Sequence, residues 1–451
     1  MKTILVIGAG RSSSSLIQYL LDHATEGKWV LKVGDVDEKN AIARVGGHPS
    51  GSGFRFDITN AAQREKEISN AVLVVSMLPA SMHGAVASDC VRLGKHLVTC
   101  SYVSDEMRAL DAEAKLKNII LLNECGLDPG IDHMSAMQII DRIKNAGGEM
   151  KAFYSYCGGL VAPESNDNPW GYKFSWNPRN VILAGQGTAQ FIENGNYKYL
   201  PYSRVFGQAT TINVDGMGAF DAYANRDSLS YRAVYGIENI PTMLRGTLRM
   251  PGFCKAWNAF VQLGWTDDTW KIHNANKLSY SQLIESFLPA GKDSIKERLA
   301  KFLGENIESD VMKKLEWLGI FSDEKTKLTE ATPAQILQDL LERKWLLKPG
   351  DKDMIVMQHR FEYTLNGKKH RVISSLVVKG ENEIHTAMAK TVGIPAAIAV
   401  KRILSGEIKR TGICVPVTND IYEPILKELE SFGVRFEEKE EILNSLETIA
   451  E

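Results

Sequence analysis

Short apolar segments alternate with amphipathic segments over the first 123 residues. Apolar runs typical of strands occupy 3–7, 29–33, 54–56, 72–76, 96–99 and 119–122, and helical patterns occupy 16–23, 61–68, 81–92 and 105–117. Strands separated by helices indicate a parallel sheet covered on both faces, because each parallel connection needs a crossover. The pattern predicts an α/β fold built on a Rossmann-like, doubly wound parallel sheet.

The pattern changes after residue 131. A helix to about 144 precedes a strand over 150–157, a mainly helical region covers 253–348, strands at 354–365 and 370–379 flank Asn366-Gly367, and an Ala-rich helix over 385–403 is interrupted by Gly393 and Pro395. An Asn-Gly pair between two strands is a strong hairpin signal. Residues 158–180 carry four large aromatic side chains that would be costly to leave in water, so we expect an ordered functional loop.

Composition and charge exclude several classes of protein. The 451 residues are 44% hydrophobic and 24% charged, with a net charge of −2, so a strongly basic nucleic-acid-binding surface is not expected. No apolar run has transmembrane length, the start lacks a signal-peptide pattern, and the six cysteines show no CxxC or metal spacing. We therefore expect a cytoplasmic protein with no membrane or nucleic-acid partner, no disulfide framework and no metal site.

A glycine-rich turn follows the first predicted strand. Gly8 would permit the tight turn and Gly10 would let a pyrophosphate approach the backbone at the start of a helix. The third glycine of the usual pattern is replaced by Ser13, which weakens the motif, and a strand-to-helix turn without a ligand is the alternative. The strand before and the helix after favour a dinucleotide site.

Asp35 ends the second predicted strand, where a carboxylate can bond both ribose hydroxyls of NAD. A carboxylate there would repel the extra phosphate of NADP by roughly 4 kcal/mol at about 4 Å and an effective dielectric constant near 20. Asp37 is the alternative if the strand ends later, and Arg44 is judged too distant to compensate. The sequence therefore predicts NAD as the cofactor, with NADP disfavoured.

Several longer motifs resemble one known family. They are Ser101–Ser104, Asn123–His133, Tyr156–Glu164, Asn168–Trp176, Asn225–Ser228, Arg245–Arg249, Trp317–Ser322, His385–Lys390 and Val392–Pro395. Together they resemble the saccharopine dehydrogenases of the L-glutamate-forming type, also called saccharopine reductases, and they follow the family's order along nearly the whole chain.

The resemblance implies an organisation and a reaction. It implies a dinucleotide-binding domain over 1–131 completed by 385–451, an α/β substrate and dimerisation domain over 132–252 and 351–384, and a helical domain over 253–350. The implied reaction oxidises the secondary amine saccharopine, an amino-acid substrate, to an imine that water splits into glutamate and 2-aminoadipate 6-semialdehyde, or runs in reverse. Family members are commonly homodimers, and the fungal ones use NADP, from which Asp35 would be a departure.

Substrate contacts are predicted from these motifs. Arg226 and Arg249 suit carboxylates because a guanidinium binds them in a planar, two-pronged manner, although structural or surface arginines are the alternative. Predicted with them are Thr247 and Leu248, which precede Arg249, and Ser101, Tyr102 and Asp128, which follow strands. Tyr102 could instead be a core tyrosine, and Asp128 could form an Asx turn; as reactive groups, both are also candidate catalytic residues.

Cofactor contacts are predicted at the glycine loop, at the carboxyl ends of the strands and, by resemblance, in the aromatic loop. The predicted residues are Gly8, Gly10, Arg11, Ser12, Ser13, Asp35, Val36, Asp57, Ile58, Leu78, Ser101, Leu127, Asp128, Pro129 and Asn177. The residue that transfers protons stays open, since His133 titrates near neutral pH but a histidine in the first turn of a helix is more often structural. Two other functions stay open: a carboxynorspermidine-type dehydrogenase, and a non-catalytic NAD-sensing protein.

Overall fold

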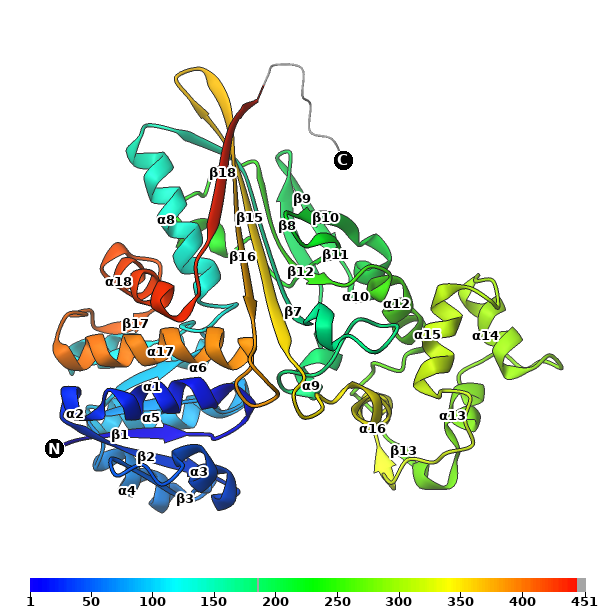
Figure 1. Cartoon of the computed structure of the whole chain (residues 1–451), viewed down its shortest axis with the longest axis horizontal. Helices are drawn as coiled ribbons and strands as arrows, with labels where there is room; N and C mark the ends of the chain where they lie inside the picture. Colours follow the sequence, from blue (N-terminus) through cyan, green and yellow to red (C-terminus); the bar gives the residue numbers. More distant parts are fainter. Residues whose placement is uncertain (185, 444–451) are drawn as a thin grey trace. The chain divides into compact units, whose positions relative to one another are not determined.

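The computed structural model describes residues 1–184 and 186–443, which form two compact units. The first unit contains Met1–Glu149 and Leu376–Glu437, and the second contains Met150–Ser375 and the chain from Glu438 (Figure 1). Each unit has its own sheet.

The described residues of the first unit contain a seven-stranded sheet in which every pairing is parallel. Its order is β17 (Gly412–Cys414), β6 (Ile120–Leu122), β5 (His96–Thr99), β4 (Leu73–Ser76), β1 (Lys2–Ile7), β2 (Trp29–Asp35) and β3 (Gly51–Arg55). The order reverses at the β1–β4 boundary, which is where ligands bind in open α/β sheets. The predicted doubly wound sheet is confirmed: five predicted strands lie at their expected places, and the third, predicted over 54–56, occupies Gly51–Arg55.

Helices cover both faces of this sheet. They are α1 (Ser14–Asp22), α2 (Ala24–Gly27), α3 (Glu38–Val45), α4 (Ala61–Ser69), α5 (His83–Leu93), α6 (Asp105–Arg108), α7 (Asp111–Leu116), α8 (Ile131–Asn145), α17 (Ala387–Ser405) and α18 (Asn419–Leu429). Right-handed crossovers place α1 and α3 on one face and α4 and α5 on the other.

Helix α17 packs along α1 (Figure 1) and continues through Gly393 and Pro395, where the sequence predicted an interruption. The glycine is required by the packing, because a Cβ at residue 393 would lie 2.8 Å from the backbone nitrogen of Leu16. Close helix contact, and not a break, therefore explains this glycine.

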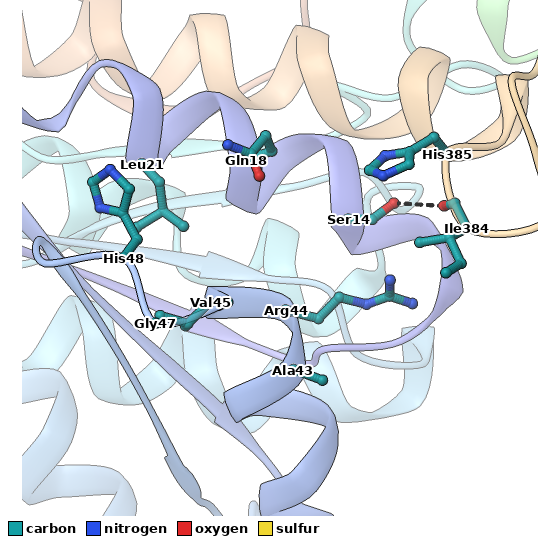
Figure 2. Close-up of a pocket in the computed structure, with 11 residues that line it drawn as sticks. Ser14, Gln18, Leu21, Ala43, Arg44, Val45, Gly47, His48, Ile384 and His385 are labelled. Atoms are coloured by element: carbon teal, nitrogen blue, oxygen red, sulfur yellow. Dashed lines mark hydrogen bonds between the residues drawn. The ribbon is translucent and has the colours of Figure 1, made fainter.

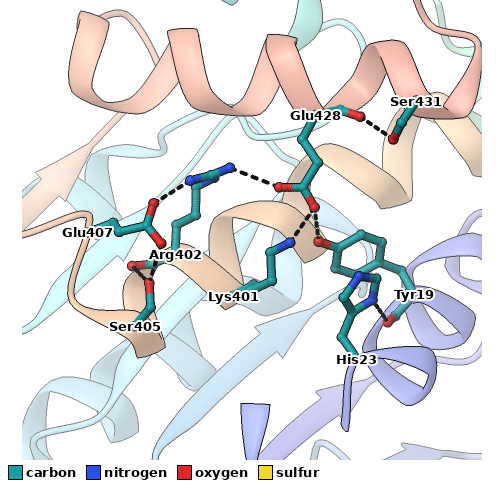
Figure 3. A network of polar contacts seen from close by, with 8 residues as sticks. All are labelled: Tyr19, His23, Lys401, Arg402, Ser405, Glu407, Glu428 and Ser431. Atoms are coloured by element: carbon teal, nitrogen blue, oxygen red, sulfur yellow. Dashed lines mark hydrogen bonds and ion pairs between the residues drawn. The ribbon is translucent and has the colours of Figure 1, made fainter. Parts of the chain in front are cut away.

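A polar network joins the C-terminal helices to α1 (Figure 3). The Glu428 carboxylate accepts hydrogen bonds from the Tyr19 hydroxyl and the Lys401 ammonium, and Arg402 Nη2 lies 2.9 Å from its second oxygen. Burial and the adjacent carboxylate raise the pKa of Tyr19. One carboxylate therefore links α1, α17 and α18.

The second unit is built on a mixed sheet with β10 (Thr210–Val214), β11 (Gly218–Ala224), β12 (Thr242–Arg249), β7 (Glu149–Val161), β15 (Asp353–Leu365), β16 (Lys368–Lys379) and β18 (Glu437–Leu443) in that order. Strand β8 (Ala189–Glu193) pairs with β12 and with β9 (Asn196–Leu200). The predicted hairpin is confirmed, because Asn366 and Gly367 turn between β15 and β16 with φ of 51° and 75°.

The helical region of this unit contains α12 (Phe253–Leu263), α13 (Tyr280–Ser286), α14 (Ile295–Leu303), α15 (Asp310–Leu318) and α16 (Pro333–Trp345), with the short strands β13 (Ile272–His273) and β14 (Glu330–Ala331). Shorter helices, α9 (Pro178–Ile182), α10 (Tyr202–Val205) and α11 (Tyr231–Val234), lie among the strands in sequence. The predicted ordered loop is buried as expected: Trp170, Tyr172 and Phe174 pack against Trp345 and the helices in one core.

The units differ in detail from the three predicted parts. Helix α8 packs against α18 and belongs to the first unit, and residues 253–350 share the core of the aromatic loop instead of forming a unit of their own. Across the described part of the chain, no helix is both long and apolar enough to cross a bilayer.

Candidate active site

The glycine loop has the geometry that a dinucleotide requires. Gly8 has a φ of 104°, and a Cβ there would lie 2.9 Å from the Met77 carbonyl oxygen, so a larger residue does not fit. A Cβ at Gly10 would meet nothing within 4 Å, so the backbone there is open to an approaching pyrophosphate. Ser13 donates a hydrogen bond to the Gly10 carbonyl at 2.9 Å and stabilises the turn into α1.

The Asp35 carboxylate is engaged by the loop itself. One of its oxygens accepts the Ala9 N–H at 2.7 Å and the other accepts the Asp37 N–H at 2.9 Å. A contact with a ribose was predicted for this carboxylate, but the Ala9 bond ties it to the glycine loop and the Asp37 bond is a local one just beyond β2.

Arg44 reaches the same loop from α3, and its Nε donates to the Ala9 carbonyl at 3.4 Å. Burial lowers the pKa of its guanidinium. Arg44 lines a cavity of about 360 Å³ (Figure 2) together with Ser14, Ile384 and His385, and no acidic residue is among the described residues that line it. Arg44 was judged too distant to compensate for Asp35, but its long side chain reaches the glycine loop.

The remaining residues of this unit that were predicted to contact the cofactor differ in exposure and in hydrogen bonding. Val36 is exposed, and Ile58 and Leu78 are half-buried against the core. The Asp57 carboxylate accepts hydrogen bonds from the Thr59 hydroxyl and N–H, and these bonds hold its pKa below the ordinary value. Arg11 is exposed and Ser12 half-buried directly after the glycine loop, while Leu127 and Pro129 are buried.

Two predicted site residues meet at the carboxyl edge of the sheet. The Tyr102 hydroxyl, which follows β5, donates a 2.9 Å hydrogen bond to Asp128 Oδ1, which follows β6. Both side chains are half-buried, and the Asp128–Pro129 peptide bond is cis. A phenol and a carboxylate in contact form a polar pair that could receive a substrate amine.

Ser101 lies beside this pair and contacts a histidine that the sequence analysis missed. His83 Nε2 lies 2.8 Å from Ser101 Oγ, and its Nδ1 lies 2.8 Å from Ser76 Oγ. Burial lowers the pKa of His83 to about 4, so the ring is neutral at neutral pH. The only sequence feature that could have indicated His83 is its position soon after β4, at the carboxyl edge of the sheet where ligands bind.

His133 takes a structural position. Its side chain is fully buried, and its Nε2 lies 2.8 Å from a Glu124 carboxylate oxygen. The less favoured possibility, proton transfer by His133, has no support in this geometry.

Arg249 is a buried cation in the second unit. It is 4% exposed, its Nη1 donates to the Leu248 carbonyl at 2.9 Å, and its Nε has no hydrogen-bond partner. Its guanidinium lies 5.3 Å from the ring of Tyr172 and 5.8 Å from that of Tyr223. Among residues 1–184 and 186–443, no carboxylate lies within ion-pair distance of it. A buried charge without a counter-ion is costly and indicates a site for an anion.

The two aromatic neighbours were not predicted as site residues. Tyr172 belongs to the aromatic loop, and Tyr223 lies on β11, where its hydroxyl accepts a 3.4 Å hydrogen bond from Arg249 Nη2. The cross-strand pairing of Tyr223 with Thr247 brings it beside the arginine, and only the sheet register shows this.

Arg226 lies apart from Arg249. Asp221 pairs with Arg249 and Ala224 pairs with Gly246, so roughly 15 Å of strand separates the level of Arg226 from that of Arg249. Arg226 is exposed, with a φ of 42°. The backbone positions of the two arginines are therefore apart, but the Arg226 charge still acts on Tyr223, whose hydroxyl accepts a hydrogen bond from Arg249.

Three other predicted residues are limited in what they can contribute. The side chain of Leu248 is fully buried in the core, so only its backbone could contact a substrate, whereas Thr247 is half-buried on the face of Arg249. The Asn177 side chain accepts the Arg179 N–H at 2.9 Å and caps α9, which leaves less of its hydrogen-bonding capacity for a cofactor.

No cluster of three or more metal-ligating side chains occurs in the described residues.

The doubly wound sheet and its glycine loop place the protein in the class of dinucleotide-dependent oxidoreductases. Residues 4–122 match the family model described as the saccharopine dehydrogenase NADP binding domain, and residues 126–434 match the saccharopine dehydrogenase C-terminal domain. The chain belongs to the saccharopine dehydrogenase family.

Individual relatives agree with this assignment. Saccharopine dehydrogenase [NADP(+), L-glutamate-forming] from Pyricularia oryzae is 34% identical over 449 residues, covering 97% of this chain and 99% of the relative. The mitochondrial alpha-aminoadipic semialdehyde synthase of Bos taurus is 35% identical over 96% of this chain, which spans 47% of that relative. The solved apo saccharopine dehydrogenase (L-Glu forming) of Saccharomyces cerevisiae superposes with a TM-score of 0.87 at 32% identity, covering 98% and 100% of the two chains.

The cofactor prediction was wrong. The matching family model is an NADP-binding domain and the fungal relatives are named as NADP(+) enzymes, which contradicts the preference for NAD. The error came from treating Asp35 as a free repulsive charge, whereas both of its oxygens accept backbone hydrogen bonds and Arg44 lies beside the loop.

Proposed function

We propose that this protein catalyses the NADP-dependent oxidation of saccharopine through an imine to L-glutamate and 2-aminoadipate 6-semialdehyde, and the reverse reductive condensation. The observation that carries the proposal is Arg249, a buried guanidinium with no described carboxylate partner. A substrate with three carboxylates supplies the counter-ion that the fold does not.

The residues have separable roles in this proposal. Arg249 binds one substrate carboxylate inside its aromatic surroundings, and Arg226 binds another. Tyr102 and Asp128 bind the secondary amine, and Asp128 is the candidate to take up its proton. When bound, the nicotinamide supplies the hydride acceptor.

The residues around the glycine loop fit NADP. The backbone at Gly10 is open to the pyrophosphate, and Arg44 is a half-buried cation beside Ala9 with no acidic residue lining its cavity. We infer that Arg44 supplies the positive charge for the 2′-phosphate.

The polyamine alternative has less support. The homospermidine synthase of Legionella pneumophila shares the fold at a TM-score of 0.59, but it is 9% identical, so the likeness concerns the fold alone. A buried cation such as Arg249 would repel a polyamine and attracts a carboxylate.

The direct test is a substrate panel followed by nicotinamide absorbance. Saccharopine and a polyamine analogue are each supplied with NADP and with NAD. We expect turnover of saccharopine with NADP. Turnover of the polyamine alone, or tight cofactor binding without any turnover, would refute the proposal.

The oligomeric state is proposed from the resemblance to the family, and the location in the cell is proposed from the cysteines. All six cysteines are free thiols, which suits a reducing compartment such as the cytoplasm. A homodimer is proposed and is tested by light scattering of the purified chain, while fractionation of cells that make the protein tests its location.

A further inference from the structure

Glu124 lies at a buried junction between the two segments that carry Tyr102 and Asp128. It is 4% exposed and has a φ of 57°, in the left-handed region. Burial and a left-handed backbone are both unfavourable for a glutamate, so surrounding contacts must hold it there.

Glu124 contacts the residues on either side of Tyr102 in the chain. Its backbone N–H donates to the Ser101 carbonyl at 3.1 Å, and its Oε1 accepts the Val103 N–H at 3.0 Å. One residue thus fixes the positions immediately before and after the tyrosine, which limits where the Tyr102 ring can point.

The second carboxylate oxygen of Glu124 reaches α8. Its Oε2 lies 2.8 Å from His133 Nε2, in the first turn of the helix. That turn is bound to the Asp128 loop, because the Asp132 N–H donates to the Leu127 carbonyl at 3.0 Å. Glu124 is therefore linked to both partners of the Tyr102–Asp128 hydrogen bond.

We propose that Glu124 is a positioning residue of the reaction: by joining the 101–103 turn to the first turn of α8, it fixes the Tyr102 hydroxyl against Asp128. The inference rests on the proposed function, in which Tyr102 and Asp128 receive the substrate amine. A catalytic group displaced by about 1 Å can lose roughly a hundredfold in rate, so the junction controls kcat without touching substrate.

The test is a double-mutant cycle on the full chain with saccharopine and NADP. Glu124→Ala should lower kcat about a hundredfold. In a Tyr102→Phe background the hydroxyl is already absent, so Glu124→Ala should cost much less. Equal losses in both backgrounds, or no loss in either, would overturn the proposal.

Two conservative variants separate positioning from folding. Glu124→Gln keeps an acceptor for Val103, and its amide can donate to His133 in the other ring tautomer, so most activity should remain. Glu124→Asp is one methylene shorter and cannot reach both partners, so kcat should fall between those of the Gln and Ala variants. A Gln variant as impaired as the Ala variant would contradict a positioning role.

The matched control is Glu67→Ala. Glu67 is also buried and pairs with Lys32, but it lies near the C-terminal end of α4, away from the carboxyl edge of the sheet. Removing it should lower stability without lowering kcat. A kcat loss as large as that of Glu124→Ala would show that any buried carboxylate of this unit matters.

Hydrogen exchange of the segment 101–103 provides a readout that does not depend on turnover. Exchange should accelerate in Glu124→Ala and stay near the wild-type rate in Glu124→Gln. If wild-type enzyme does not turn over saccharopine, the proposed function fails, and the exchange data still decide whether Glu124 holds this segment; unchanged exchange in the Ala variant would overturn that.

Discussion

Replacing Arg249 by methionine should raise thermal stability while abolishing efficient turnover. Methionine keeps the apolar stem among Tyr172, Tyr223 and Phe253 but removes a guanidinium that is 4% exposed and lacks a described counter-ion. Without substrate, the folded protein bears the desolvation cost of this charge, and its removal should increase the free energy of unfolding by on the order of 1 kcal/mol. That corresponds to a rise in Tm of about 2–4 °C.

The catalytic effect should be opposite in sign and larger. Loss of a buried charge partner for a substrate carboxylate costs about 2–5 kcal/mol, or roughly 30-fold to several thousandfold in kcat/KM. The assays are calorimetry of the free protein and steady-state kinetics with saccharopine and NADP. Arg249→Lys should retain part of the activity, since an ammonium keeps the charge but not the two-pronged geometry.

Arg204→Ala is the matched control, because Arg204 is an exposed arginine of the same unit, on α10. It should change neither Tm nor kinetics. The reasoning is refuted if Arg249→Met lowers Tm by several degrees while saccharopine kinetics stay unchanged, since Arg249 would then be a structural residue and not an anion site.

Three further predictions concern the first unit. Arg44→Ala should weaken binding of adenosine 2′,5′-bisphosphate roughly tenfold to a hundredfold and leave binding of 5′-AMP unchanged, as measured by calorimetry. Replacing the exposed Arg435 by alanine is the control. Equal losses of affinity for both ligands would show that Arg44 does not bind the 2′-phosphate. The pKa of His83 falls from 6.5 unfolded to about 4 folded, so the unfolded chain binds the extra proton and stability falls as pH drops through that interval, by up to about 3 kcal/mol. His83→Asn should flatten this part of the pH–stability curve, and an unchanged curve would contradict the assignment. Glu428→Gln should weaken the contacts among α1, α17 and α18 and lower the Tm of the unit without changing kcat, which melting and kinetics together would check.

The periodic parts of the fold could be predicted from the sequence. Five of the six apolar runs before residue 123 reappear as largely buried strands, because a strand buried on both faces needs a continuous apolar run that nothing else in the segment mimics. The third strand, Gly51–Arg55, lies at the edge of the sheet and has no buried residue, so its bounds were predicted less well. Helix α3 and strands β8 to β12 were missed. Helix α3 and strand β12 have segments of mixed polarity, and β12 pairs with β11 and β7 over a long separation in sequence. Strands β8 and β9, by contrast, form a local hairpin around Asn194-Gly195, a turn signal that was overlooked.

The candidate site could be predicted only in part. Tyr102 and Asp128 were both expected at the carboxyl edge, but their mutual hydrogen bond depends on loop conformations that no periodicity encodes. His83 and Tyr223 were missed because their neighbours come from other strands, so the sequence offers no local motif for them.

Asp35 and Arg249 show why residue type alone misjudges a charge. Asp35 was expected to repel a phosphate as an isolated charge, yet the N–H groups of Ala9 and Asp37 bind its two oxygens and the Arg44 guanidinium donates to the same loop. Arg249 is the reverse case: the sequence permitted a surface arginine, and the structure buries it with no described carboxylate. How far each charge argues for a ligand depends on the contacts that the fold gives it, and the sequence does not show those contacts.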